Sequence, residues 1–128
     1  MRTREITHER WQHFLGDFAQ LHQGEHVNVE TIGEGAFGVR SQMCDQPLIG
    51  IVDTEPKARP DEEWIEIIAG DSPATAAIHA ISHPSRVVIA EEEDGQDVAL
   101  QIDSADGLIT MVRFEPPLEG MPAGFTVV

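Results

Sequence analysis

A single apolar stripe near the start of the chain, followed almost everywhere by strand-like alternation, most constrains the fold. The stripe repeats at helical spacing and consists of Trp11, Phe14, Leu15, Phe18 and Leu21. This spacing places the five side chains on one face of an amphipathic helix. Thr7 stands where an N-cap is needed, and Gly24 stands where the helix has to end. We predict one N-terminal helix whose apolar face packs on a sheet.

From residue 26 onward, apolar and polar residues alternate in the way that is typical of β-strands. The expected strands span residues 26–32, 39–43, 48–53, 64–69, 77–82, 86–91, 98–103 and 108–114. Asp106 and Gly107 favour a tight hairpin turn between the last two strands. Gly50 and Pro84 are candidate corners where a sheet bends.

These elements predict the α+β class, with the N-terminal amphipathic helix packed on a curled antiparallel sheet. A strongly bent sheet could close into a small barrel of the SH3 or Sm-like kind, and an open sheet with the helix across it is the alternative. We expect one globular domain over residues 1–115 and an irregular C-terminal tail over residues 116–128, where prolines and glycines accumulate.

Charge restricts the partners of this chain. Asp and Glu total 23 against eight Lys and Arg, which gives a formal net charge of −15. Nucleic-acid affinity depends on neutralising phosphates, so we expect no nucleic-acid partner. Anionic membrane surfaces are disfavoured for the same reason. The negative charge is consistent with a basic protein partner, with a bound cation, or simply with high solubility.

The remaining composition predicts a cytoplasmic protein. No run reaches the roughly 18 to 20 apolar residues that span a bilayer, and the charged N-terminal segment lacks a secretory signal. Cys44 is the single cysteine, so no internal disulfide forms. Asp45 beside it opposes thiolate formation, which makes Cys44 an ordinary small residue rather than a nucleophile.

A glycine-rich motif, Ile-Gly-Glu-Gly-Ala-Phe-Gly-Val, occupies residues 32–39 and resembles the loop that covers ATP phosphates in protein kinases. The other parts of a kinase are missing from the sequence, including the catalytic His-Arg-Asp and the metal-binding Asp-Phe-Gly. Lys57, the only lysine, lies in a proline-flanked loop rather than on a strand. We interpret the motif as a hairpin connection whose glycines supply positive φ angles.

Metal-binding candidates are weak. His79 and His83 flank a strand end, but four residues of extended chain separate them by roughly 13 Å unless the chain folds back at Pro84. Zinc would need further ligands, for which His26 or Glu30 are the candidates. The acidic runs at residues 61–63 and 91–94 could attract calcium or magnesium, yet they lack the EF-hand spacing and suit solvated loops.

No nucleophile elbow, Cys-His pairing or metalloprotease helix occurs, and the chain has no tyrosine. We therefore expect no enzyme and no cofactor, although a site dispersed along the chain escapes this kind of search. The final residues, Thr126-Val127-Val128, match a form that peptide-binding domains capture by its carboxylate. A tail that packs along its own sheet edge is the alternative.

Several segments together resemble DUF5335, a bacterial domain-of-unknown-function family. They are residues 3–6, Arg10-Trp11 with Phe14, residues 65–67, residues 79–84, and residues 99–102 continuing through Asp106-Gly107 to Arg113-Phe114. The resemblance covers most of the chain. It implies a small, soluble, single-domain bacterial protein and offers no catalytic residues to transfer.

Two functions from different classes are consistent with these patterns. The first is a non-enzymatic interaction module whose acidic surface meets a protein partner or its own copies. The second is a small ligand- or metal-binding protein, or an enzyme, with a dispersed site between helix and sheet. A flat acidic or apolar patch would favour the first function, and a deep pocket with converging polar groups would favour the second.

Overall fold

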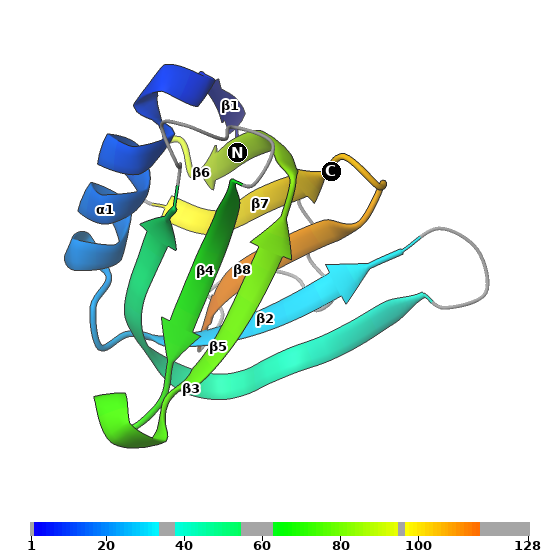
Figure 1. Cartoon of the computed structure of the whole chain (residues 1–128). Coiled ribbons are helices and arrows are strands. Elements are labelled where there is room, and N and C mark those ends of the chain that lie inside the picture. Colours follow the sequence, from blue (N-terminus) through cyan, green and yellow to red (C-terminus); the bar gives the residue numbers. More distant parts are fainter. Residues whose placement is uncertain (1, 34–37, 55–62, 95–96, 116–128) are drawn as a thin grey trace.

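The computed structural model describes residues 2–33, 38–54, 63–94 and 97–115 (Figure 1). The strands are β1 (Arg2–Ile6), β2 (His26–Ile32), β3 (Val39–Asp53), β4 (Trp64–Ala69), β5 (Ala77–Ser82), β6 (Pro84–Glu91), β7 (Asp97–Ser104) and β8 (Ile109–Glu115). The helical elements are the α-helix α1 (Trp11–Leu21) and two 3₁₀ turns, η1 (His8–Arg10) and η4 (Pro73–Thr75).

The strands form one antiparallel sheet in the order β1-β6-β7-β8-β2-β3-β4-β5. Within the described ranges, β1 and β5 are its two edges and do not pair with each other. The sheet curls, so that α1 lies along one side while the β2–β3 hairpin projects on the opposite side (Figure 1). A mostly antiparallel sheet with one α-helix confirms the predicted class in outline.

The long strand β3 joins the two parts of the sheet. Two separate strands, 39–43 and 48–53, were expected here, and that division is wrong because one strand continues through both. The polar stretch between them forms a bulge, at which Asp45 has a φ of 52° and donates its N–H to Asn28 Oδ1 at 2.7 Å. Pairing also shifts next to Gly50 and Pro84, so the strand pairing is irregular at both candidate corners.

The apolar stripe of the helix reaches the core as predicted, with one exception. Trp11, Leu15 and Phe18 are buried, and α1 contacts β3. Trp11 also donates its indole N–H to the carbonyl of Ile6 at 2.9 Å. Leu21, in contrast, is 72% exposed, because the helix ends there. Among the helices of the described residues, none is long and apolar enough to cross a membrane.

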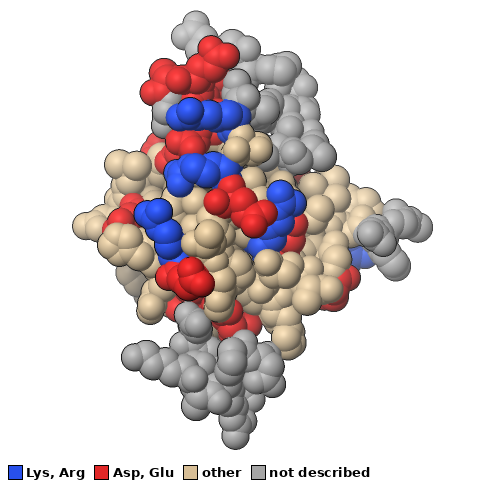
Figure 2. Space-filling view, turned by 90° about the horizontal axis from the view of Figure 1, so that it is seen from above, with Lys and Arg blue, Asp and Glu red and all other residues tan. Residues whose placement is uncertain are grey.

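The N-terminal strand β1 was not expected from the sequence. Its burial pattern leaves only Ile6 in the core, so its residues carry little apolar alternation. Charged side chains attach β1 to β6 instead, since Arg4 pairs with Glu91 at 3.2 Å and Arg86 pairs with Glu5 at 2.7 Å. Seen from above, the basic side chains lie among acidic ones rather than in a patch of one sign (Figure 2).

Two apolar clusters lie on this sheet. The main core includes the helix stripe and the inward residues of most strands. A smaller second cluster is built on β6, β7 and β8, and it consists of Ala90, Val98, Ala99 and Met111, with Ile32 and Ile109 packed against it. These strands are therefore apolar on both faces, as in fully buried sheets. The predicted tail of residues 116–128, with Thr126-Val127-Val128, lies outside the described residues.

Candidate ligand-binding pocket

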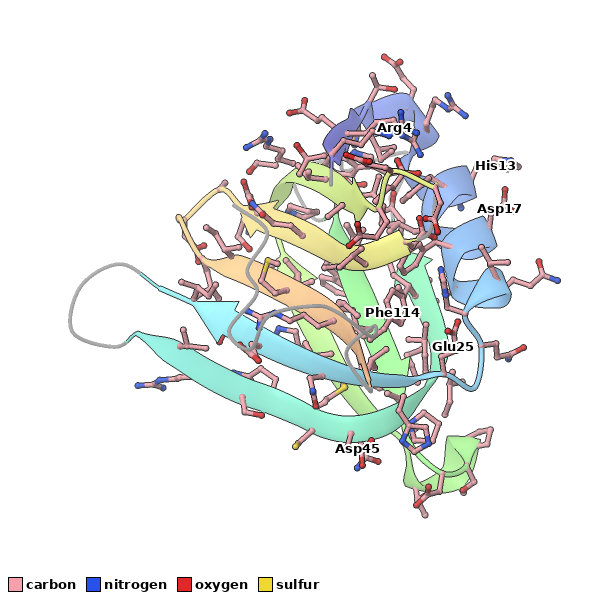
Figure 3. The ribbon with its side chains drawn as sticks, turned by 180° about the vertical axis from the view of Figure 1, so that it is seen from behind. Arg4, His13, Asp17, Glu25, Asp45 and Phe114 are labelled. Carbon is pink, nitrogen blue, oxygen red and sulfur yellow. The ribbon has the colours of Figure 1, made fainter. Side chains whose placement is uncertain are left out.

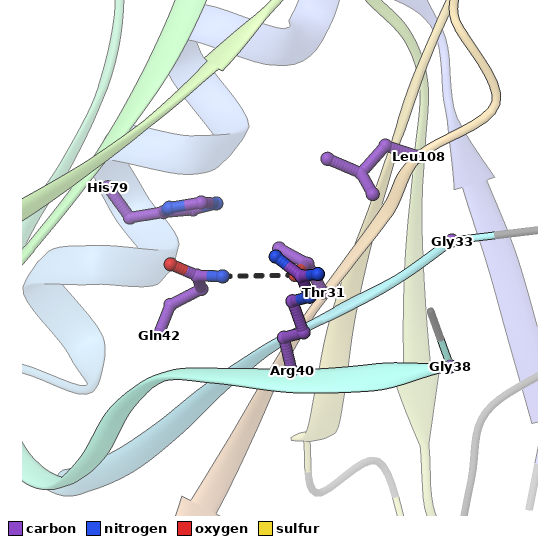
Figure 4. A pocket seen from close by; sticks show the side chains of 7 residues that line it. All are labelled: Thr31, Gly33, Gly38, Arg40, Gln42, His79 and Leu108. Carbon is purple, nitrogen blue, oxygen red and sulfur yellow. Dashed lines mark hydrogen bonds between the residues drawn. The ribbon is translucent and has the colours of Figure 1, made fainter. Parts of the chain in front are cut away.

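A pocket of about 400 Å³ opens where the β2–β3 hairpin, the inner face of β5 and the turn before β8 come together (Figure 4). The described residues that line it are Thr31, Gly33, Gly38, Arg40, Gln42, His79 and Leu108. Its volume lies within the range of small-molecule sites in proteins. The helix packs on the same concave face, toward the end away from the hairpin, where Trp11, Leu15 and Phe18 belong to the main core (Figure 1).

Strand register explains why polar side chains line this pocket. Along β2, the inward positions run Val27, Val29 and then Thr31, and the first two are fully buried. Thr31 pairs with Arg40 on β3 and with Thr110 on β8, so these side chains share its face of the sheet. The inner face thus changes from apolar to polar at the far end of the hairpin. Polar residues at positions that face inward are unusual in a core and are typical of functional sites.

His79 faces the pocket from the edge strand. It pairs with Ile67, a fully buried residue, so its side chain points to the concave side of the sheet. Its Nε2 atom is buried and has no hydrogen-bond partner among the described residues. Burial lowers the pKa of His79 below its ordinary value of 6.5, because the charged form loses its hydration. His79 is therefore a neutral imidazole near pH 7.

Thr31 offers a hydroxyl donor to the pocket, and Thr110 lies beside it without lining the pocket. Gln42 donates its side-chain N–H to Thr31 Oγ1 at 3.1 Å, which leaves the hydroxyl proton of Thr31 free for another acceptor (Figure 4). Thr110, beside Thr31 on the same face, is fully buried, and its hydroxyl has no partner within the described residues. An unpartnered buried hydroxyl is costly unless a water or a ligand satisfies it.

Two glycines of the kinase-like motif form the pocket rim. Gly33 donates its N–H to the carbonyl of Gly38 at 3.2 Å, and Gly38 has a φ of +55°. Together with the pairing of Ile32 and Val39, this confirms the hairpin interpretation of the motif. A Cβ added to Gly33 would meet Leu108 at an ordinary contact distance of 3.7 Å. Residues 34–37 of the motif, like Lys57, lie outside the described residues.

His79 and His83, the candidate metal ligands, have different surroundings. His83 lies at the corner between β5 and β6 with a φ of 51°, where its N–H bonds to the carbonyl of Glu63 and its own carbonyl accepts from Ala105. It does not line the pocket. The described part of the chain contains no group of three or more His, Cys, Asp or Glu placed to hold a metal ion. A metal at these two histidines stays a prediction.

The described residues of the two acidic runs do not line the pocket. Of residues 61–63, only Glu63 is described; it is buried, and its Oε1 lies 2.9 Å from His8 Nε2. Glu91 of the second run pairs with Arg4. Cys44 is exposed.

A second titratable cluster lies at the C-terminal end of α1. His22 bonds to Glu25 through Nδ1 and to Asp97 through Nε2, the latter at 2.8 Å. The rings of Phe18 and Phe114 lie 4.7 Å and 4.4 Å from the imidazole. Of the residues in this cluster, Figure 3 labels Phe114 and Glu25. Burial alone would lower the pKa of His22, but the hydrogen bonds and negative charges of Asp97 and Glu25 outweigh it and raise the pKa above 6.5. His22 is closed off by these partners and acts as a structural tie.

The sequence pattern singled out His79 as a metal-ligand candidate and the rim glycines only as part of a hairpin connection, and it did not indicate the rest of the pocket. Thr31, Arg40, Gln42 and Leu108 come from three separate segments and match no motif. One signal was present: inward positions of the first predicted hairpin carry Thr31 and Arg40 where Val27 and Val29 precede them. Recognising it requires the register of the hairpin, which only the structure supplies.

Comparison with known protein families shows to which family the chain belongs. The family described as "Family of unknown function (DUF5335)" matches residues 2–123, and the chain therefore belongs to this family. The comparison with curated proteins finds no match, and neither does the comparison with solved structures.

Proposed function

We propose that this member of the DUF5335 family binds a small polar molecule in the pocket at the β2–β3 hairpin. One observation carries the proposal: His79, whose Nε2 is buried and has no partner within the described residues, lines a pocket whose other walls carry Thr31, Arg40 and Gln42. A ligand with hydrogen-bonding groups would satisfy that nitrogen. Converging polar groups in a concave site were the feature expected of the ligand-binding function, although the site lies within the curl of the sheet rather than beneath the helix.

Native mass spectrometry of the untagged protein purified from its own source tests this function first. We expect a retained mass of small-molecule size in the wild-type protein. Gln42→Leu keeps the shape of the side chain but removes its bond to Thr31, so the retained mass should be lost or reduced in this variant. Gln20→Leu, an exposed position on α1, is the control that should keep it.

A fragment screen by NMR provides the decisive readout, because a weakly held ligand can be lost during purification. Fragments that bind the pocket should shift the side-chain resonances of His79 and Gln42. If a broad library of polar fragments moves neither residue, and the purified protein carries no extra mass, the ligand-binding function is wrong.

A second function, self-association, is favoured by the edge strand β5. This strand has the sequence Ala-Ile-His-Ala-Ile-Ser, without the proline, lysine or acidic residues that usually protect an edge. On the outer face beside it, Ile78 is 59%, Val52 45% and Trp64 44% exposed. We propose that two copies pair through β5, since antiparallel pairing would satisfy the edge backbone and bring together surfaces that carry little charge in a highly acidic chain.

Sedimentation velocity over a range of concentrations tests this pairing. Ile78→Lys places a charge on the proposed interface and should shift the protein to a monomer. Leu21→Lys changes an equally exposed apolar residue on α1 and should leave the association unchanged. A wild-type protein that is monomeric at all concentrations would exclude the interaction through β5.

The setting of this function is inferred from composition. We propose a bacterial cytoplasmic protein without nucleic-acid or membrane partners, supported by the net charge of −15 and the single cysteine. Closure of the curled sheet into a small SH3 or Sm-like barrel is likewise a proposal. The curved course of β3 (Figure 1) supports it, and an experimental structure would test it.

A further inference from the structure

We infer that residues 116–128 of the chain dock on the outer face of strands β6, β7 and β8. This outer face is the side of the three strands that points away from the main core, and it carries the smaller apolar cluster. Figure 3 views the molecule from the side on which β7 (yellow) and β8 (orange) lie in front. The contact is independent of the proposed ligand-binding pocket.

Strand register brings the outward side chains of β6, β7 and β8 together. The inward positions of β6 belong to the main core, so the alternate positions, Val88 and Ala90, point outward. On β7 they pair with Gln101 and Ala99, and Gln101 pairs in turn with Met111 on β8. Because residues directly opposite in antiparallel strands share a face, these five side chains form one surface.

The outward side chains are shielded from solvent. Ala90 and Met111 are 0% exposed, Ala99 is 1%, Val88 is 5% and Gln101 is 6% exposed. On an uncovered sheet, neighbouring side chains flank a residue but leave it open from above. A methionine on such a face would stay accessible, so another part of the molecule must lie over Met111.

The described elements do not supply this cover. The helix α1 packs against β3, and its buried side chains belong to the main core. Within the described ranges, β6, β7 and β8 mainly contact their neighbours in the sheet, and β7 also contacts the edge strand β5. The cover of the outer face therefore comes from outside the described residues or from another molecule.

Residues 116–128 have a composition that fits an apolar surface. They contain a single charged residue, Glu119, although 24% of the chain is charged. Their large apolar residues are Leu118, Met121, Phe125, Val127 and Val128. Burying such side chains against the outer face removes apolar surface from water on both sides of the contact.

The segment also starts in the right place. It follows Glu115, the last residue of β8, so it is attached to the outer face itself. Eight extended residues reach roughly 26 Å, whereas β6 lies two strand spacings, about 10 Å, from β8. This attachment gives the segment a high effective concentration at the face, which favours it over a second copy of the chain.

Prolines suit a segment that crosses the strands rather than one that lengthens β8. Pro116 and Pro117 have no N–H group, so the hydrogen-bonded ladder of β8 cannot continue through them. Together with Pro122 they also reduce the number of backbone donors that need a partner when the segment is covered.

The extent of the family match agrees with this docking. The DUF5335 match continues to residue 123, whereas β8 ends at Glu115. The region shared by the family therefore includes residues 116–123, as expected for a segment that packs on its own domain.

NMR of the full chain, isotope-labelled at the methionine methyl groups, tests the docking. The chain has four methionines, of which Met111 lies on the outer face and Met121 lies in the segment. We expect the Met111 methyl group to show cross-peaks to protons of residues 116–128 and to be protected from a soluble paramagnetic reagent. A mixture of labelled and unlabelled chains, which reports contacts between molecules, should lack these cross-peaks.

Leu118→Asp combined with Met121→Asp places charges in the segment and should release it from the face. The Met111 methyl group should then lose the cross-peaks and be broadened by the reagent. Leu21→Asp introduces a charge at an exposed position on α1 and is the control that should keep Met111 protected. Met43, a buried residue of the main core, should stay protected in both variants. If the doubly substituted variant unfolds and exposes Met43, the wild-type spectra alone decide.

Three results would overturn the docking. If Met111 in the wild type is broadened as strongly as an exposed methyl group, the outer face is open. Cross-peaks in the mixed sample would place a second copy on the face. Protection of Met111 without cross-peaks to residues 116–128, or protection that persists in the doubly substituted variant, would mean that a different segment covers it. None of these results concerns fragment binding at the pocket, so the two proposals fail separately.

Discussion

The Nε2 atom of His22 lies 2.8 Å from Asp97 Oδ2, which ties the end of α1 to the first residue of β7. The other ring nitrogen bonds to Glu25, so the imidazole lies between two carboxylates. Both nitrogens must carry protons to donate to both acids, and this arrangement therefore favours the charged imidazolium.

His22→Gln should make the protein less stable by about 2 to 4 kcal/mol near pH 6, because two charge-assisted hydrogen bonds are lost. The pKa of His22 is raised in the folded state, so its contribution is complete below the ordinary pKa of 6.5 and disappears as pH rises through the folded value. Urea unfolding at several pH values should show the difference between wild type and variant decreasing toward alkaline pH.

His13→Gln is the matched control for this experiment. His13 pairs with Asp17 on the solvent side of α1 at 3.1 Å, and both side chains are largely exposed. Exposed ion pairs of this kind contribute little to the free energy of unfolding, so this variant should be nearly as stable as the wild type. A difference between wild type and His22→Gln that stays constant with pH would contradict the imidazolium tie.

His79 should show the opposite pH dependence. Its pKa is lowered by burial, so its neutral form favours the folded state above pH 6.5, and this stability is lost as pH falls toward the folded value. In an NMR titration of the histidine side chains, His79 should titrate below 6.5 and His22 above it. In the His79→Gln variant, the free energy of unfolding should decrease less as pH falls below 6.5. A decrease as large as in the wild type would contradict the argument that burial lowers the pKa of His79.

Leu15→Ala should cost about 2 to 5 kcal/mol of unfolding free energy, because Leu15 is fully buried beneath α1 and its removal leaves a cavity. Leu21→Ala makes the same chemical change on the same helix, but Leu21 is 72% exposed. This control should change stability by less than about 0.5 kcal/mol. The midpoints of urea unfolding compare the two variants directly. If both lose the same unfolding free energy, the helix packs on the sheet through a different face.

Replacing glycine by alanine should lower the stability of the protein at one position and raise it at another. Gly107 has a φ of +92° in the turn between β7 and β8, so Gly107→Ala should destabilise the protein by about 1 kcal/mol or more. Gly16 lies within α1 with open space around it, so Gly16→Ala should stabilise by about 0.5 to 1 kcal/mol. Thermal unfolding measures both; a stabilising Gly107→Ala would mean that the turn does not need a left-handed residue.

Gly33→Ala tests the pocket without disturbing the hairpin. The added methyl group would contact Leu108 at 3.7 Å, so the fold should tolerate it while the mouth of the pocket narrows. We expect unchanged stability to within about 0.5 kcal/mol and weaker binding of any fragment found by the screen. If the variant binds the ligand as strongly as the wild type does, the ligand does not bind next to Gly33.

Local pattern by itself determined the helix, most of the strands, the turn at Gly107 and the irregular pairing beside Gly50 and Pro84. Each depends on residues close together in the chain: a repeat of 3.6 residues, an alternation of two, or a glycine where φ must be positive. The sequence also indicated that the kinase-like motif connects two strands, because the other parts of a kinase are missing from the chain.

Only the tertiary structure decided the rest. The strand β1 contains one buried residue and is held by pairing with β6, so no local apolar pattern marked it. The continuity of β3 depends on a bulge that its partner strand stabilises. The pocket joins Arg40 and Gln42 to His79 and Leu108, because the sheet curls until its edge faces its own hairpin. Side chains far apart in the sequence converge only through that curl, and no spacing along the chain records it.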